Sequence, residues 1–124
     1  MNIALWIVAI VLAVGFAAAG AMKLAQSKDK LAASGMGWVE NFSPSAVKAI
    51  GAVEILGAVG LVLPAAVGVA PILVPLAAAG LALVMVGAII VHARRGEAQS
   101  IAINVVLLAL AAFVAWGRFG PYAF

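Results

Sequence analysis

The sequence predicts an all-α fold: an integral membrane four-helix transmembrane bundle, formed as a single domain over residues 1–124. Hydrophobic residues make up 68% of the chain and charged residues only 9%, whereas about 25% of an ordinary globular protein is charged. A soluble domain of this size could not bury so many apolar side chains. The apolar residues also fall into runs long enough to cross a bilayer.

The first predicted span covers residues 3–24 and is apolar until Lys23. About 20 apolar residues are enough to cross the hydrocarbon core. The segment differs from a secretory signal peptide because it has no positively charged start and its apolar run is longer than an h-region. We therefore expect it to remain in the protein as a transmembrane helix.

The second and third spans share one apolar run, with no charged residue between Ile55 and Val91. As a single helix this run would be roughly 55 Å long, whereas the bilayer core is roughly 30 Å thick. The chain must therefore turn, and residues 64–71, with two prolines and a glycine, are the expected place. The two predicted spans are 44–63 and 71–92.

The fourth predicted span covers residues 98–117. The polar connection between the first two spans, residues 25–43, is expected to lie at the interface, where it could also cover one end of the bundle. It ends at Ser43, which is followed by proline, a typical helix start. Trp38 and Phe42 are expected at the level of the lipid headgroups.

The chain carries a net charge of +3, but its cations are scattered and do not form the basic surface of a nucleic-acid-binding protein. All of them except Arg118 flank the connections between spans one and two or three and four. The positive-inside rule then predicts these connections in the cytoplasm and both termini outside, in a bacterial-type cytoplasmic (inner) membrane. The cations at the predicted cytoplasmic side are Lys23, Lys28, Lys30, Lys48, Arg94 and Arg95.

The remaining composition limits chemistry and favours close packing. The chain has no cysteine, one histidine and four acidic residues, so neither a thiol site nor a metal cage is expected. Small residues let transmembrane helices approach one another, and their number predicts a tight bundle. They are Gly15, Ala19, Gly20, Gly51, Gly57, Gly60, Gly80 and Gly87.

Glu54 is an acidic residue near the middle of the second span. Its helical neighbours at spacings of three and four are Gly51, Gly57 and Ala58, the smallest face of that helix, so we expect it to point into the bundle. An isolated buried carboxylate costs several kcal/mol, so Glu54 must be protonated or paired. Lys23 and His92 are both candidate partners.

The other spans bring polar residues toward the same depth. Four residues from four helices form the predicted ligand-binding or proton-relay site, with no catalytic residue: Glu54, His92, Lys23 and Asn104. An intramembrane acid is a functional-site hypothesis by default, although polar groups between helices also serve simply as packing contacts. The predicted supporting residues are Ser100, Gly51, Gly57 and Gly20.

Several motifs together resemble the DoxX-like family of small four-helix membrane proteins. They are "FAAAGAMKL", "SGMGW", "AIGAVEILGAVGLVLP", "GAIIVHARRGE" and "INVVLLALAAFVAW", in that order along nearly the whole chain. The resemblance implies that Lys23, Glu54, His92 and Asn104 are the polar signature residues. Relatives in that family include a subunit associated with thiosulfate:quinone oxidoreduction, a membrane component of an oxidative-stress complex and an animal receptor-assembly chaperone.

Three functional hypotheses follow. The first is an accessory subunit that binds a lipophilic small molecule such as a quinone and supports a membrane redox system. It needs a membrane or peripheral redox partner because no side chain here carries electrons, so no stand-alone enzyme activity is expected. The second is a non-enzymatic assembly or chaperone subunit, and the third is proton or solute transport, for which a homo-oligomer could form a pathway.

Overall fold

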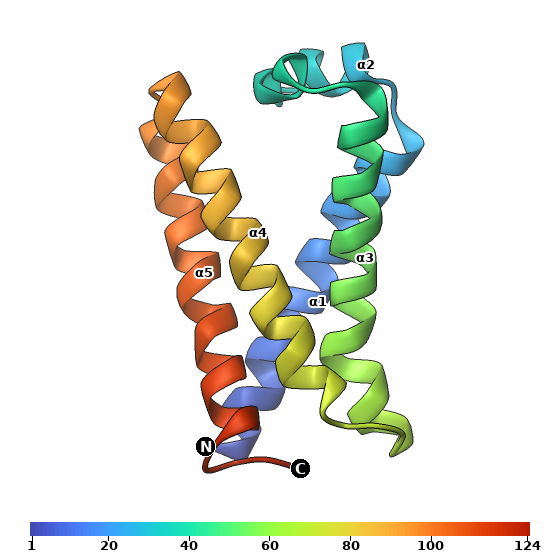
Figure 1. Cartoon of the computed structure of the whole chain (residues 1–124), viewed down its shortest axis with the longest axis vertical. Helices are drawn as coiled ribbons and strands as arrows, with labels where there is room; N and C mark the ends of the chain where they lie inside the picture. Colours follow the sequence, from blue (N-terminus) through green and yellow to red (C-terminus); the bar gives the residue numbers. More distant parts are fainter.

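The structure, a computed structural model, describes residues 1–124 and confirms the predicted fold class. Four helices are long and apolar enough to cross a membrane, and no strand is present. They run alternately up and down, so that both termini lie at one end (Figure 1). Their bounds are Asn2–Ala25 (α1), Pro44–Val67 (α3), Leu73–Arg95 (α4) and Ala98–Phe119 (α5).

Two short helices connect α1 to α3 at the end away from the termini (Figure 1). They are α2, Lys28–Ala33, and the 3₁₀ helix η1, Gly37–Asn41. The start of α3 follows the prediction: the Ser43 hydroxyl accepts a hydrogen bond from the backbone N–H of Ala46 at 3.1 Å. This bond satisfies one of the free N–H groups of the first turn.

The turn between α3 and α4 is shorter than predicted. The helix α3 continues through Pro64 as far as Val67, and α4 begins at Leu73 rather than at residue 71. A proline removes only one hydrogen bond of the preceding turn, and membrane helices tolerate this. The helix ends at Gly68 instead, because Gly68 adopts the left-handed conformation, with φ of 69°, that closes a helix.

The helices pack as two pairs, α1 with α3 and α4 with α5. The pairs meet in the half of the bundle that holds the termini and diverge toward the other end (Figure 1). The main core fills the half where they meet. Its buried residues are Ala9, Leu12, Phe16, Ala58, Leu61, Val74, Ala78, Leu81, Met85, Ala111 and Val114.

Glycines set the contact between α1 and α3. A Cβ atom added to Gly20 would lie 2.5 Å from the backbone oxygen of Gly51, so no larger residue fits there without separating the helices. The expectation of a tight bundle is wrong for other positions. Gly15, Gly80 and Gly87 have no atom within 4 Å of an added Cβ, so they mark open space rather than helix contacts.

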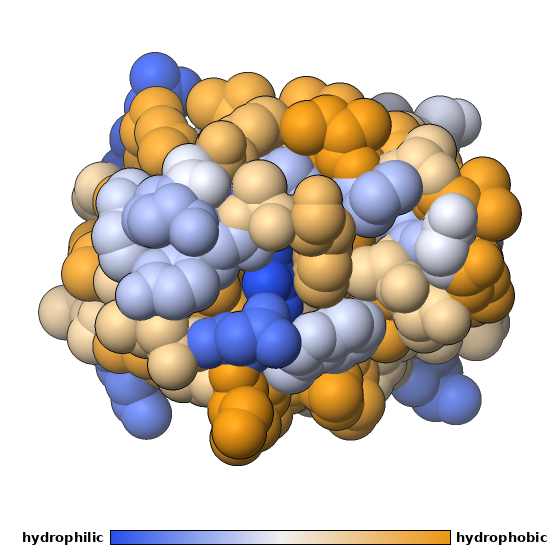
Figure 2. All heavy atoms as spheres, turned by 90° about the horizontal axis from the view of Figure 1, so that it is seen from below, coloured by the Kyte–Doolittle hydropathy of each residue, from blue (hydrophilic) through white to orange (hydrophobic).

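The end with the termini contains a buried cation, Arg118, which was expected from the sequence only as the single cation on its side of the membrane. Arg118 is 4% exposed and donates hydrogen bonds to Asn2 Oδ1 at 2.6 Å and to the backbone oxygen of Tyr122 at 2.9 Å. Its guanidinium also lies 3.9 Å from the centre of the Phe124 ring. Figure 2 shows this end, largely apolar with hydrophilic atoms recessed near its middle. Arg118 therefore ties α5 to the start of α1.

The outer surface of the bundle is apolar. Ile3, Leu56 and Leu83 are 74%, 72% and 73% exposed, each on a different helix. Contiguous apolar surface of this kind is unfavourable in water and favourable against lipid chains. The protein is a multi-pass integral membrane protein.

Candidate functional site

A cavity of about 770 Å³ lies between the two helix pairs, in the half where they diverge. Fifteen of its 21 lining residues are hydrophobic, and all four long helices contribute to the wall. Pockets for small molecules commonly measure about 300–1,000 Å³ and combine an apolar wall with a few polar groups. The volume and lining of this cavity match that description.

The connection between α1 and α3 forms the roof of the cavity. Leu31 and Val39 are fully buried and pack against Val47 of α3, so the segment folds back over the bundle. This brings Trp38 and Phe42 onto the cavity wall, with their ring centres 5.7 Å apart. The small buried cluster turns both rings toward the cavity, a contact that the expected position at headgroup level did not include.

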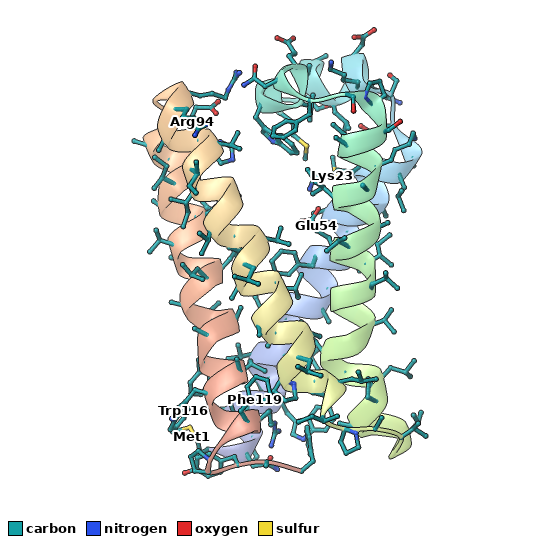
Figure 3. The ribbon with its side chains drawn as sticks, viewed as in Figure 1. Met1, Lys23, Glu54, Arg94, Trp116 and Phe119 are labelled. Atoms are coloured by element: carbon teal, nitrogen blue, oxygen red, sulfur yellow. The ribbon has the colours of Figure 1, made fainter.

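Lys23 and Glu54 form an ion pair across α1 and α3. The distance from Lys23 Nζ to Glu54 Oε1 is 2.5 Å, and their side chains are 7% and 4% exposed. Figure 3 shows the two side chains directed toward one another beside the space between the helix pairs. Both are among the lining residues of the cavity. Of the two pairings that the sequence left open, the structure has the one with Lys23.

His92 lines the opposite wall and takes part in a second polar cluster. Its Nδ1 lies 2.9 Å from Glu97 Oε1, and Arg95 Nε donates to the same oxygen at 3.0 Å. Because a carboxylate only accepts hydrogen bonds, Nδ1 carries the proton and Nε2 of a neutral ring is an acceptor. The hydrogen bond from His92, followed by Arg95, lowers the pKa of Glu97 below its ordinary value. This role of Glu97 and Arg95 was not predicted from the sequence.

Asn104 supplies an unused hydrogen-bond donor to the cavity wall. The residue is only 9% exposed, and its Nδ2 atom is buried without any hydrogen-bond partner. Leaving a buried donor unpaired costs about 1–3 kcal/mol, so native structures rarely retain one without a reason. A bound molecule that presents an acceptor oxygen to Asn104 would satisfy it.

The structure thus brings Lys23, Glu54, His92 and Asn104 to the wall of one cavity. Ser100, one turn before Asn104, is not on that wall. The three glycines predicted as supporting residues lie behind the wall, where they allow helix contacts: Gly20 and Gly51 between α1 and α3, and Gly57 against Leu81 of α4.

The sequence profile described as the DoxX-like family matches residues 7–114. The matched segment includes every polar residue of the cavity wall and the roof above it. Comparisons with curated proteins and with solved structures gave no match.

Proposed function

The chain belongs to the DoxX-like family, and we propose that it is an accessory subunit that binds a quinone-like lipophilic molecule and supports a membrane redox system. One observation carries the proposal: the unpartnered amide of Asn104 is buried in the wall of a largely apolar cavity of about 770 Å³. A quinone has carbonyl oxygens that accept hydrogen bonds and a ring and chain that prefer apolar surroundings.

The remaining polar groups suit a second oxygen of such a molecule. The Lys23 ammonium has three N–H groups, and Glu54 occupies one of them, so others are free to donate. Trp38 of the roof lies above Lys23, with its ring centre 5.7 Å from Nζ, and gives the head an aromatic surface to pack against. Donors on α1 and α5 can thus hold two oxygens on opposite sides of one ring.

The polar cluster at the cavity edge supports a route for protons. His92 lines the cavity, and its Nδ1 contacts Glu97, which lies in the connection between α4 and α5. A histidine can pass a proton from one ring nitrogen to the other at neutral pH. The chain has no cysteine and no other side chain suited to electron transfer, so the proposal assigns electron transfer to a partner protein.

We also propose that the end with the roof faces the cytoplasm of a bacterial-type membrane. The connections between α1 and α3 and between α4 and α5 lie at that end (Figure 1), and they carry or flank all the cations except Arg118. The positive-inside rule supports this orientation. Cysteine residues introduced at Ser34 and at the exposed Val69 would test it, because an impermeant thiol reagent applied to intact cells should label only the second.

Binding can be measured through Trp38, the only one of the three tryptophans on the cavity wall. Trp6→Phe and Trp116→Phe leave it as the sole tryptophan of the purified protein. A benzoquinone with a ten-carbon chain should quench its fluorescence saturably. Asn104→Leu should weaken binding about tenfold, the effect of one hydrogen bond to a buried donor.

The matched control is Ser100→Ala, on the same helix but off the cavity wall, which should bind the quinone as the parent protein does. Absence of saturable quenching in the parent would refute the proposed function, as would equal binding by the Asn104→Leu variant. A protein that binds no quinone yet co-purifies with other membrane proteins would favour the assembly role instead.

A further inference from the structure

We propose that the ligand reaches the cavity from within the bilayer, through an opening between α1 and α5, and keeps a single long chain in that opening while its head lies inside. The inference rests on the proposed function and specifies its ligand class: a lipophile with one chain and an uncharged head that bears an acceptor oxygen. The residues around the opening carry the argument.

The helices α1 and α5 touch near the termini and separate above. In the half with the termini, called the closed half below, a Cβ atom added to Gly117 of α5 would lie 2.7 Å from the side chain of Leu5 of α1. In the open half, Val11 and Ile103 line the cavity, yet they are 60% and 55% exposed. A side chain that belongs both to the cavity wall and to the outer surface marks a place where the wall is interrupted.

The other sides of the cavity are more closed. Gly20 and Gly51 bring α1 and α3 into contact, and α4 packs along α5. Between α3 and α4, the lining residues Ile50 and Ala88 are only partly exposed, and the exposed lining residue on this side is Gly87, on α4 alone. Trp38 and Phe42 cover the end that faces water. Only the side between α1 and α5 has exposed lining residues on both of its helices, and we infer that the way out of the cavity leads to the lipid there.

The positions of the polar groups set the direction in which a ligand lies. The buried amide of Asn104 lines the cavity, and the side chain of its neighbour Ile103 lies at the opening. An oxygen held by Asn104 thus leaves the attached chain next to Ile103, from where it can pass into the membrane. Because Lys23 and Glu54 already neutralise one another, the wall offers no net charge to an anionic head, which favours an uncharged one.

Gly15 provides a direct test because it lines the opening on α1 and an added Cβ would meet nothing within 4 Å. Gly15→Leu should fold normally and occupy the space of the chain. Gly80→Leu is the matched control: Gly80 is an equally unobstructed helix glycine, and it does not line the cavity. Two probes are compared in the protein with Trp38 as its only tryptophan: the benzoquinone with a ten-carbon chain, and the same ring with a methyl group in place of the chain.

The inference expects Gly15→Leu to weaken binding of the chain-bearing quinone at least tenfold and to change binding of the methyl quinone less than twofold. Gly80→Leu should change neither. Unchanged binding of the chain-bearing probe by Gly15→Leu would overturn the inference and leave the proposed function standing, as would an equal loss for both probes. Failure of both probes to bind the parent protein would overturn the proposed function as well.

Discussion

The two ends of the bundle are built from the same four helices but are stabilised in different ways. In the half with the termini, the pairs meet around a core of buried apolar residues, and the one buried cation, Arg118, is satisfied by Asn2, a backbone oxygen and aromatic rings. In the other half the pairs diverge, and an ion pair, a histidine and an unpartnered amide face a cavity. The first half has its buried polar groups satisfied within the chain, whereas the second leaves two buried atoms, Asn104 Nδ2 and Gln26 Oε1, without a hydrogen-bond partner.

The closed half therefore provides most of the stability of the bundle, whereas the open half holds the candidate site. Lipid gives helices little hydrophobic reason to associate, so close packing and hydrogen bonds hold the closed half together. The open half gives up packing contacts to leave space, and such sites commonly reduce the stability of the ligand-free protein. Variants in the two halves should therefore respond differently to the same kind of change.

The largest effect is expected from breaking the buried ion pair. Lys23→Met keeps the length of the side chain but leaves the Glu54 carboxylate buried without its partner. Removing one member of a buried pair costs about 3–5 kcal/mol. The free energy of unfolding, measured in mixed micelles with a denaturing detergent, should fall by that amount.

The double variant Lys23→Met/Glu54→Leu serves as the control. Replacing both charges with apolar side chains removes the desolvation cost together with the attraction and is often close to neutral. Most of the lost stability should therefore return. A Lys23→Met protein as stable as the parent would show that the ion pair does not support the open half.

The next effect concerns the contact between α1 and α3. Gly20→Ala places a methyl group 2.5 Å from the backbone oxygen of Gly51, which cannot move aside without displacing α3. Overpacking of this kind costs about 1–3 kcal/mol. Gly15→Ala, on the same helix but with nothing within 4 Å, should instead gain about 0.5–1 kcal/mol of helix stability. Equal unfolding free energies for the two variants would contradict a close contact between α1 and α3 at Gly20.

Much of the fold could be predicted from the sequence because apolar runs and polar connections determine how many times a chain crosses the bilayer. Ser43 before Pro44 predicted the start of α3 correctly. The end of α3 was predicted too early, because Pro64 looks like a stop signal while Gly68, with its left-handed backbone, is the residue that ends the helix. The open space beside Gly15 was also missed, since composition alone does not say which small residues meet a neighbour.

The candidate site could likewise be predicted only in part. Helical spacing was enough to expect Glu54 on an inner face. The partner of Glu54 could not be chosen, because Lys23 and His92 both end their helices on the same side of the membrane, and only the tertiary packing brings Lys23 within reach. The inward rotation of Trp38 depends on Leu31 and Val39 packing against α3, a contact distant in sequence that no local pattern reports.

Asn104 distinguishes a binding residue from a packing residue. Asn104→Leu removes a buried donor that has no partner, and relieving such a group should raise the unfolding free energy of the ligand-free protein by about 1 kcal/mol. The same substitution should weaken quinone binding. Gain of stability with loss of binding is the expected signature of a site residue. A loss of stability would instead indicate that Asn104 holds the helices together.

The smallest effect is expected at the edge of the cavity, from pH. The contacts with His92 and Arg95 lower the pKa of Glu97 from its ordinary value of 4.5. The charged form is therefore favoured in the folded protein, and its contribution to stability is present above pH 4.5 and lost as the pH falls through the lowered pKa. The effect should be small because solvent screens an ion pair near the surface.

Arg95 makes this titration visible at the roof, since its guanidinium nitrogen lies 2.8 Å from the Cβ position of Gly37, next to Trp38. Protonation of Glu97 should free Arg95 and shift the emission of Trp38 in the protein with Trp38 as its only tryptophan. Glu97→Gln should remove that acid transition and leave the others. A transition that persists unchanged in the Glu97→Gln variant would show that the roof is held by contacts within α2, η1 and α3 alone, with no contribution from the charges at the edge of the cavity.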